Sequence, residues 1–363
     1  MNLNKYTELG RKYFVEAEPL AMIYFVTKTC NCTCAHCFYW ESLNKPRPKE
    51  LTLEELDKIT DGLGKLLYLR LSGGEPFIRK DLFEIISLFT KKCRPHYIGI
   101  PTNGFYTSKI VEFAKKVSSL DTRVEIGISI DDIGDFHNKI RGPQNLFNIA
   151  METFKELKSI KSSTPNLNAG FITTVMKSNK DRLLQLFEYL KNLEPDSIAC
   201  NIIRDDTKVE EEKEIDQDLC QRFSNLCDEY NNKKTKQTPT LFNKLRQEKT
   251  LYAHEIRSKT VETNEYQIPC VAGNKIVVMY SEGEVHPCET LGYEIGNIRD
   301  YNYNMNELLQ SDRACAIREK IIKGHCFCTH ECFTTASITF SKKQAIKVLG
   351  RILLKHESRK YSA

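Results

Sequence analysis

Residues 29–40 read Thr-Cys-Asn-Cys-Thr-Cys-Ala-His-Cys-Phe-Tyr-Trp, and the interpretation of the whole chain starts from this stretch. Cys30, Cys34 and Cys37 have the spacing C-x3-C-x2-C. Three thiolates on one short loop can bind three irons of a [4Fe–4S] cube and leave the fourth iron open to a small molecule. Zinc is one alternative, but a structural zinc site takes four ligands and no second Cys pair lies nearby. A redox disulfide is another, which one C-x-x-C supports weakly.

Composition indicates an ordinary globular protein. Of the 363 residues, 40% are hydrophobic and 28% are charged, which favours one large domain with a smaller one. The net charge of +5 permits an anionic substrate, but Lys and Arg form no concentrated stripe, so a nucleic-acid partner is not expected. Without a signal peptide or a membrane-spanning apolar run, a cytoplasmic location and no membrane partner are expected. In a cytoplasmic protein, fourteen cysteines indicate metal or redox chemistry.

Apolar runs alternate with helical patterns along the first two thirds of the chain. Six such runs predict strands, and Thr52 with Glu55 forms a capping box at the start of the first intervening helix. The expected strands are 20–27, 66–71, 97–101, 124–130, 168–175 and 197–203. This α/β alternation predicts parallel βα units and fits a partial (β/α)6 barrel, whose chemistry lies where the strands end.

Polar motifs follow these expected strands. In Ser72-Gly73-Gly74-Glu75-Pro76 the glycines let the backbone pass close to a ligand, and Glu75 offers an anion to an ammonium group, although a plain tight turn would also fit. Asn103 lies in a Thr-Asn-Gly turn after the third run. Ser129 and Asp131 share one face of the fourth strand end.

Weaker candidates complete the ring of strand ends. His137 and Arg141 lie in the stretch Asp-Phe-His-Asn-Lys-Ile-Arg-Gly, where Arg141 is a candidate carboxylate contact or a surface helix residue. Asn179 and Arg204 follow the fifth and sixth strands. His36, inside the cysteine loop, is expected to pack beside a cluster rather than bind it.

A second cysteine group lies near the C-terminus. Cys270, Gly283 and Cys288 follow C-x12-G-x4-C, and an apolar run with a Ser-Glu-Gly turn predicts a hairpin that brings the two cysteines together. Cys326, Cys328 and Cys332 come after a gap, with Cys315 outside the pattern. Five candidates exceed four ligands, and zinc is the alternative to iron.

The cysteine loop and the Gly-Gly-Glu-Pro motif resemble those of the radical S-adenosylmethionine (SAM) superfamily. In that family the open iron of a [4Fe–4S] cluster holds the amino and carboxylate groups of SAM, aromatic residues lie by the adenine, and the Glu holds the amino group. The resemblance covers roughly residues 20–335. The SAM contacts that it implies are Phe38, Trp40, Gly73, Gly74, Glu75, Asn103, Ser129, Asp131 and Arg141.

The C-terminal cysteines resemble the auxiliary-cluster extensions called SPASM and twitch domains. A full SPASM region has seven cysteines, so the shorter pattern here implies one auxiliary [4Fe–4S] cluster, with Cys270, Cys288, Cys328 and Cys332 as the favoured ligands and Cys326 as substitute. The expected division is a lead-in at 1–19, the barrel at 20–205, a helical connector at 206–265, a cysteine-rich α+β domain at 266–340, and a basic amphipathic helix at 341–363.

The resemblance implies an enzyme that cleaves SAM reductively to a 5′-deoxyadenosyl radical and abstracts hydrogen from a small molecule, a sugar or a peptide. The auxiliary cluster would allow net oxidation, and a flavodoxin or ferredoxin would supply electrons. A SPASM-type peptide maturase is the alternative enzyme. A non-catalytic iron–sulfur or zinc protein is the other alternative, but it would not need Glu75, Ser129 or the paired glycines.

Overall fold

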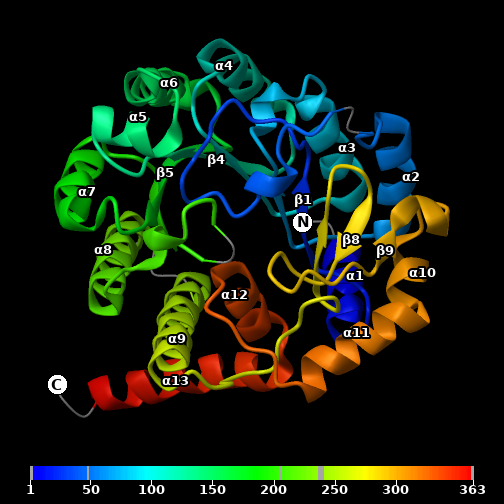
Figure 1. Cartoon of the computed structure of the whole chain (residues 1–363). Helices are drawn as coiled ribbons and strands as arrows, with labels where there is room; N and C mark the ends of the chain where they lie inside the picture. The colour runs from blue at the N-terminus through cyan, green and yellow to red at the C-terminus, as the bar shows by residue number, and fades with distance from the viewer. Residues whose placement is uncertain (1–2, 47–48, 205–206, 236–240, 361–363) are drawn as a thin grey trace.

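The computed structural model describes residues 3–46, 49–204, 207–235 and 241–360. Within these residues the strands form one nine-stranded sheet in the order β6-β5-β4-β3-β2-β1-β7-β8-β9 (Figure 1). The strands are β1 (Ala21–Phe25), β2 (Tyr68–Ser72), β3 (Tyr97–Thr102), β4 (Arg123–Ser129), β5 (Leu167–Val175), β6 (Ser197–Ile202), β7 (Ile276–Met279), β8 (Glu284–His286) and β9 (Gly296–Asn297). The first six pair in parallel, which confirms the predicted partial barrel.

Helices cover the outer face of the parallel strands. Side chains alternate along each strand, so that Leu69 and Leu71 pack into the core under the helices, while Arg70 between them points to the inner face. The helices of this half are α2 (Leu53–Leu63), α3 (Leu82–Cys93), α4 (Thr107–Lys116), α5 (Asp135–Arg141), α6 (Leu146–Ser159) and α7 (Leu183–Asn192). The predicted capping box of Thr52 and Glu55 is present at the start of α2.

The C-terminal hairpin extends the sheet of the barrel. Strand β7 pairs in parallel with β1, with Ala21 opposite Ile276, and β8 and β9 continue antiparallel. Gly283 makes the turn between β7 and β8 at a φ of 94°, and a Cβ there would lie 2.8 Å from Asn297 Oδ1. The cysteine-rich segment is therefore hydrogen-bonded, through β7, to β1, the strand that leads into the first cysteine loop.

Helices of the C-terminal half close the open side of the barrel. In Figure 1, α9 and α12 lie between the β6 edge and the β7–β9 edge. The ring of Phe340, at the end of α12, stacks on Tyr68 of β2 with 6.2 Å between centroids. The helices of this half are α8 (Gln217–Thr235), α9 (Leu241–Thr263), α10 (Met305–Gln310), α11 (Asp312–Lys323), α12 (Glu331–Phe340) and α13 (Lys342–Lys360).

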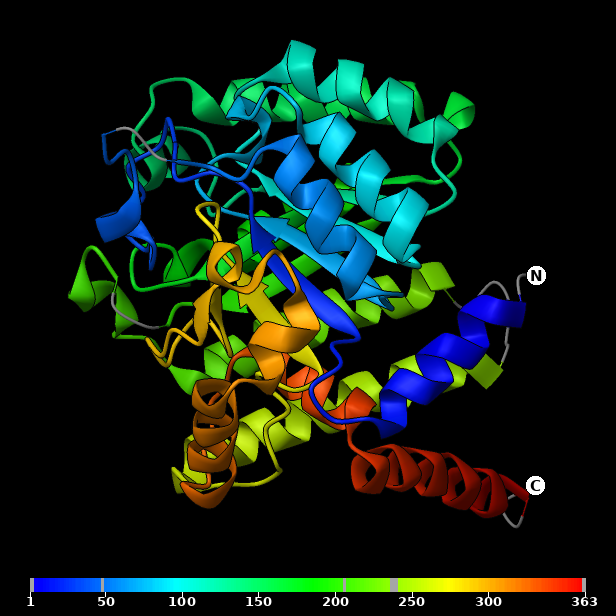
Figure 2. The same cartoon turned by 90° about the vertical axis from the view of Figure 1, so that its right-hand side faces the viewer.

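The N-terminal segment differs from the expected polar lead-in, because it forms helix α1 (Leu3–Phe14). Lys12 is buried, and its Nζ donates to the carbonyl oxygens of Leu63 (3.0 Å) and Lys65 (2.7 Å). A lysine bound to backbone carbonyls gives no hydropathy signal, so the docking of α1 could not be read from composition. Helices α1 and α13 extend toward the same side of the molecule (Figure 2). No helix in the described part of the chain is long and apolar enough to cross a membrane.

Candidate active site

The first cysteine loop follows β1 and is held in place by an asparagine. Asn44 accepts a hydrogen bond from the Cys30 backbone N–H and donates to the Cys30 carbonyl oxygen, both at 3.0 Å. The side chains of Cys30, Cys34 and Cys37 are half-buried, whereas Cys32 is buried. The three thiols that the motif selects are thus the accessible ones of this loop.

The spare thiol and the three motif thiols differ in acidity. Hydrogen bonds to Cys30 and Cys34 raise the pKa of Cys32 far above its ordinary value, so Cys32 is the donor of the group. Its hydrogen bond, together with the charge of Arg141, lowers the pKa of Cys34 to about 6, and it also lowers the pKa of Cys30. Burial raises the pKa of Cys37 to about 12. The pKa of two of the three motif thiols is therefore shifted toward the thiolate form that binds metal.

Glu75 is buried beside this loop and its carboxylate is held by three donors. Oε1 accepts from the Thr102 hydroxyl (2.7 Å) and the Phe77 N–H (3.1 Å), and Oε2 accepts from the Asn103 N–H (2.7 Å). Burial outweighs these bonds and raises the pKa of Glu75 to about 7. A ligand ammonium nearby would restore the ionised form at neutral pH.

Gly73 and Gly74 are required by packing within the chain, whereas the sequence suggested close approach to a ligand. A Cβ on Gly73 would lie 2.5 Å from the Thr27 carbonyl oxygen, and one on Gly74 would lie 2.1 Å from the Thr29 carbonyl oxygen. The Gly74 and Glu75 N–H groups donate to these two carbonyls. The glycines therefore let the β2 turn pack against the backbone that enters the cysteine loop.

A buried ion pair lies across from Glu75 at the end of β4. Arg141 Nε donates to Asp131 Oδ2 at 2.7 Å, and His36 Nε2 is 3.7 Å from the same oxygen. Arg141 Nη1 also lies 4.0 Å from the Cys34 sulfur, so this side chain is a buried neighbour of the thiols and not a surface residue. Burial lowers the pKa of His137, whose Nδ1 accepts from the Asp131 N–H, to about 3, so this imidazole is neutral.

The remaining predicted contacts lie at different distances from this centre. Asn103 Nδ2 donates to Asn31 Oδ1 of the cysteine loop at 2.8 Å, and Ser129 ends β4 half-buried. Asn179 Nδ2 donates to the Asp131 carbonyl oxygen at 2.7 Å. Phe38 packs under Arg204, with the guanidinium 5.5 Å from the ring, whereas Trp40 is 40% exposed.

Three of the five C-terminal thiols, those of Cys270, Cys326 and Cys328, line one small pocket. The thiol of Cys270 interacts with those of Cys288, Cys326 and Cys328. Cys332 instead faces Arg70 and His330, whose charges outweigh burial and lower its pKa. The favoured set, which included Cys332 and held Cys326 in reserve, stays a prediction.

Sequence reasoning missed a buried charge cluster beside these thiols. Glu289 Oε2 accepts from Arg204 Nη2 at 3.1 Å and pairs with His330 Nε2 at 2.5 Å. Burial opposes ionisation of Glu289, but these two partners lower its pKa to about 2. Glu289 directly follows Cys288, and His330 lies between Cys328 and Cys332, so proximity to the cysteine pattern was the available signal.

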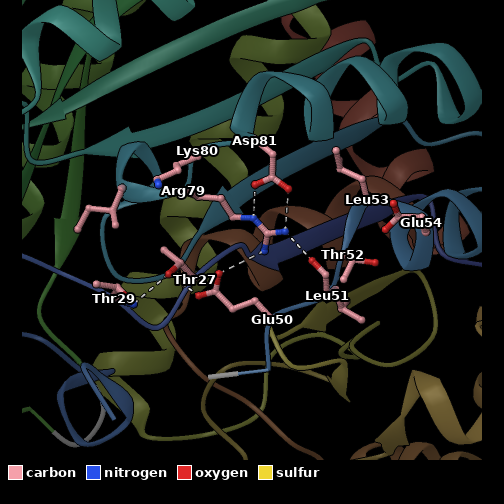
Figure 3. A pocket seen from close by; sticks show the side chains of 11 residues that line it. Thr27, Thr29, Glu50, Leu51, Thr52, Leu53, Glu54, Arg79, Lys80 and Asp81 are labelled. Carbon is pink, nitrogen blue, oxygen red and sulfur yellow. Dashed lines mark hydrogen bonds and ion pairs between the residues drawn. The ribbon is translucent and has the colours of Figure 1, made fainter. Parts of the chain in front are cut away.

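A pocket of about 490 Å³ lies outside this centre, around Arg79 (Figure 3). The guanidinium donates to Asp81 (2.8 Å) and to the Val26 (2.8 Å) and Leu51 carbonyl oxygens, and Glu50 lies 3.6 Å away. The charges at its centre are paired with one another, and Arg79 ties the end of β1 to the starts of α2 and α3.

The donors of the first loop fit an iron–sulfur cluster. Its thiols are soft ligands, and the cysteines of such a loop bind different irons of a cube, so they need not converge on one ion. No three His, Cys, Asp or Glu side chains of the described residues converge on a single-ion site. Asn31 Nδ2, His36 Nδ1 and His137 Nε2 are buried around the loop and have no hydrogen-bond partner among the residues that the structure describes. Such orphaned polar atoms fit a site that holds a further polar group.

Two family profiles match the chain. The Radical SAM superfamily matches residues 24–201, and the SPASM iron–sulfur cluster-binding domain matches residues 270–333. The chain belongs to the radical SAM superfamily. This radical SAM protein accordingly has SAM and [4Fe–4S] clusters as its cofactors.

Two curated relatives and one solved structure are similar to this radical SAM protein. It is 29% identical to the mycofactocin maturase MftC of Mycolicibacterium smegmatis over 46% of this chain and 40% of that protein. It is 27% identical to the AdoMet-dependent heme synthase of Methanosarcina barkeri over 78% of this chain and 80% of that one. The fold matches SAM-bound SuiB of Streptococcus suis with a TM-score of 0.60 at 13% identity, over 87% of this chain and 72% of SuiB.

Proposed function

We propose that this protein cleaves SAM reductively and abstracts hydrogen from a substrate that lies between the barrel and the C-terminal cysteines. One observation carries the proposal: three accessible thiols, a buried carboxylate and a buried ion pair meet where the parallel strands end. A non-catalytic iron–sulfur protein would have no use for the buried Glu75, whose ionisation burial opposes. Strand ends are where βα barrels carry their chemistry.

Different residues would bind the cluster and SAM. Cys30, Cys34 and Cys37 would hold the cluster, with Cys32 donating a hydrogen bond to its neighbours. Glu75 would accept the SAM ammonium, and Arg141 would attract its carboxylate while staying paired with Asp131. When bound, the cluster supplies one electron to the sulfonium, so that SAM yields methionine and a 5′-deoxyadenosyl radical. Burial of these side chains excludes water from the reacting groups.

A second cluster would be bound by Cys270, Cys288, Cys326 and Cys328. Their mutual interactions favour this set over one that includes Cys332. Residues 266–340 would then act as an auxiliary unit that takes up an electron from the substrate, giving a net oxidation. Glu289 and His330 would stabilise the unit by their buried ion pair.

The relatives support two substrate classes. The alignment with the mycofactocin maturase MftC spans 175 residues, less than half of this chain, whereas the alignment with the AdoMet-dependent heme synthase covers 78% of it. SuiB is also known bound to its precursor peptide SuiA. We therefore retain a non-peptide small molecule as the first candidate and a peptide as the second.

Anaerobic SAM cleavage with dithionite tests the proposal. Ala variants of Cys30, Cys34 and Cys37 should release no 5′-deoxyadenosine, because each removes an iron ligand. The matched control is Cys32→Ala in the same loop, which should remain active. An active Cys34→Ala enzyme would overturn the assignment.

A further inference from the structure

One side chain of the barrel contacts both cysteine segments. Arg204 lies two residues after β6, and its guanidinium is 5.5 Å from the centroid of the Phe38 ring, which directly follows Cys37 in the first cysteine loop. Its Nη2 also donates to Glu289 Oε2 at 3.1 Å, and Glu289 directly follows Cys288. A guanidinium within about 6 Å of a ring centroid is attracted to the ring, so Arg204 joins the two segments through an ion pair and a cation–π contact.

The carboxylate that binds Arg204 is itself fixed. The side chains of His330 and Glu289 are only 2% and 6% exposed, and His330 Nε2 pairs with the same carboxylate oxygen at 2.5 Å. The other ring nitrogen of His330 accepts from the Cys332 N–H at 3.3 Å, at the start of α12, and the ring packs edge-on against Phe333 with 4.9 Å between centroids. Glu289 is therefore a rigid anchor, and the position of Arg204 depends on the C-terminal cysteine segment.

A second contact of the Phe38 ring comes from the barrel. Phe25 on β1 is fully buried, and its ring meets that of Phe38 edge-on, with 6.3 Å between centroids and an angle of 87°. The sheet fixes Phe25, so this contact does not depend on the C-terminal half. Phe38 itself is half-buried, and loss of the Arg204 contact would leave its ring less constrained.

We propose that Arg204 is a positioning residue: held by Glu289, it fixes the Phe38 ring, so that tight binding of SAM requires the C-terminal cysteine segment in its docked position. The inference rests on the proposed function, because Phe38 contacts SAM only if this site binds SAM. Arg204 acts through Phe38 and does not touch SAM itself. A ring that is fixed before binding loses less conformational entropy when the ligand arrives, which raises the affinity.

Anaerobic titration calorimetry of SAM with the reconstituted full chain tests the contact with Phe38. Arg204→Gln should raise the SAM dissociation constant about fivefold, which corresponds to about 1 kcal/mol, the size of a cation–π contact at a partly exposed site. Phe38→Leu should raise it as well, and Arg204→Gln in that background should add nothing further. The matched control is Arg351→Gln on α13, where the guanidinium lies 5.2 Å from the Tyr252 ring and pairs with Glu248 at 2.6 Å. This control variant should bind SAM like wild type.

Glu289→Gln tests the contact with the C-terminal segment. The change keeps the size of the side chain but removes the charge that holds Arg204, so the dissociation constant should rise toward the Arg204→Gln value. The Arg204→Gln/Glu289→Gln double variant should match Arg204→Gln alone, because Glu289 acts only through Arg204. Bound iron should stay at the wild-type level in every variant, which separates positioning from loss of a cluster.

Four results would each overturn the inference while wild-type protein still binds SAM. They are unchanged affinity in either single variant, an effect of Arg204→Gln that persists without the Phe38 ring, additive effects of the Arg204 and Glu289 changes, and loss of iron in Glu289→Gln. Wild-type protein that binds no SAM would instead overturn the proposed function, and the inference with it.

Discussion

Replacing Glu75 by glutamine tests the proposed SAM site most directly. The change keeps the size of the side chain and removes the charge that would face the SAM ammonium. A hydrogen bond to a charged group contributes about 1.5–3 kcal/mol. The SAM dissociation constant should therefore rise roughly 10- to 150-fold.

The free energy of unfolding should change far less than the affinity. Burial raises the pKa of Glu75 from 4.5 to about 7, so its ionised form destabilises the SAM-free protein by about 3 kcal/mol above neutral pH. Because the folded-state pKa is the higher one, the wild-type protein is free of this penalty below about pH 4.5. Its stability falls as the pH rises from there to about 7. Glutamine removes that penalty.

Glutamine also brings a cost of its own. Its amide oxygen can replace Oε1, but its NH2 group then faces the Asn103 N–H, and one unsatisfied buried donor costs about 1–3 kcal/mol. The two effects nearly cancel at neutral pH. Urea unfolding of the variant should thus give a free energy within about 2 kcal/mol of wild type.

Anaerobic titration calorimetry at several pH values measures the affinity of wild type and variant for SAM. Wild-type affinity should rise between about pH 6 and about pH 8, because only ionised Glu75 attracts the ammonium, and the variant should lack this rise. Glu84→Gln, exposed on α3, is the matched control and should bind like wild type. Unchanged affinity in Glu75→Gln, or the same pH dependence in both proteins, would refute the reasoning.

Further variants test the clusters and the packing of the loop. Anaerobic analysis should find roughly eight irons per chain, and roughly four in a Cys30/Cys34/Cys37 triple Ala variant. In that triple background Cys326→Ala should lose the remaining iron and Cys332→Ala should keep it; the reverse result would return Cys332 to the ligand set. Gly74→Ala should lower the unfolding free energy by about 1–3 kcal/mol or more, because its Cβ meets the Thr29 carbonyl oxygen at 2.1 Å. Gly10→Ala, with open space at its Cβ, is the control; equal stability of the two variants would contradict the close approach.

Much of the fold and part of the site could be predicted because the relevant signals are local. Thr52 and Glu55 form their capping box within four residues, and the apolar runs mark strands whose ends differ from the prediction by a few residues. The neighbourhood of Cys30, Cys34, Glu75 and Asp131 followed from the rule that parallel strands end at one edge of a sheet. Helix α1 was missed because its anchor is Lys12, a charged side chain that binds backbone carbonyls.

The sequence by itself determined the parallel βα order, the spacing of the first three thiols and the family. Those features depend on residues close together in the chain, where the period of hydrophobicity and the spacing of ligands are visible directly. Only the tertiary structure decided that β7 pairs with β1, that Cys270, Cys326 and Cys328 line one pocket, and that Glu289 pairs with His330. These contacts join segments up to about 250 residues apart, and their free energy comes from packing and charge that no local pattern encodes.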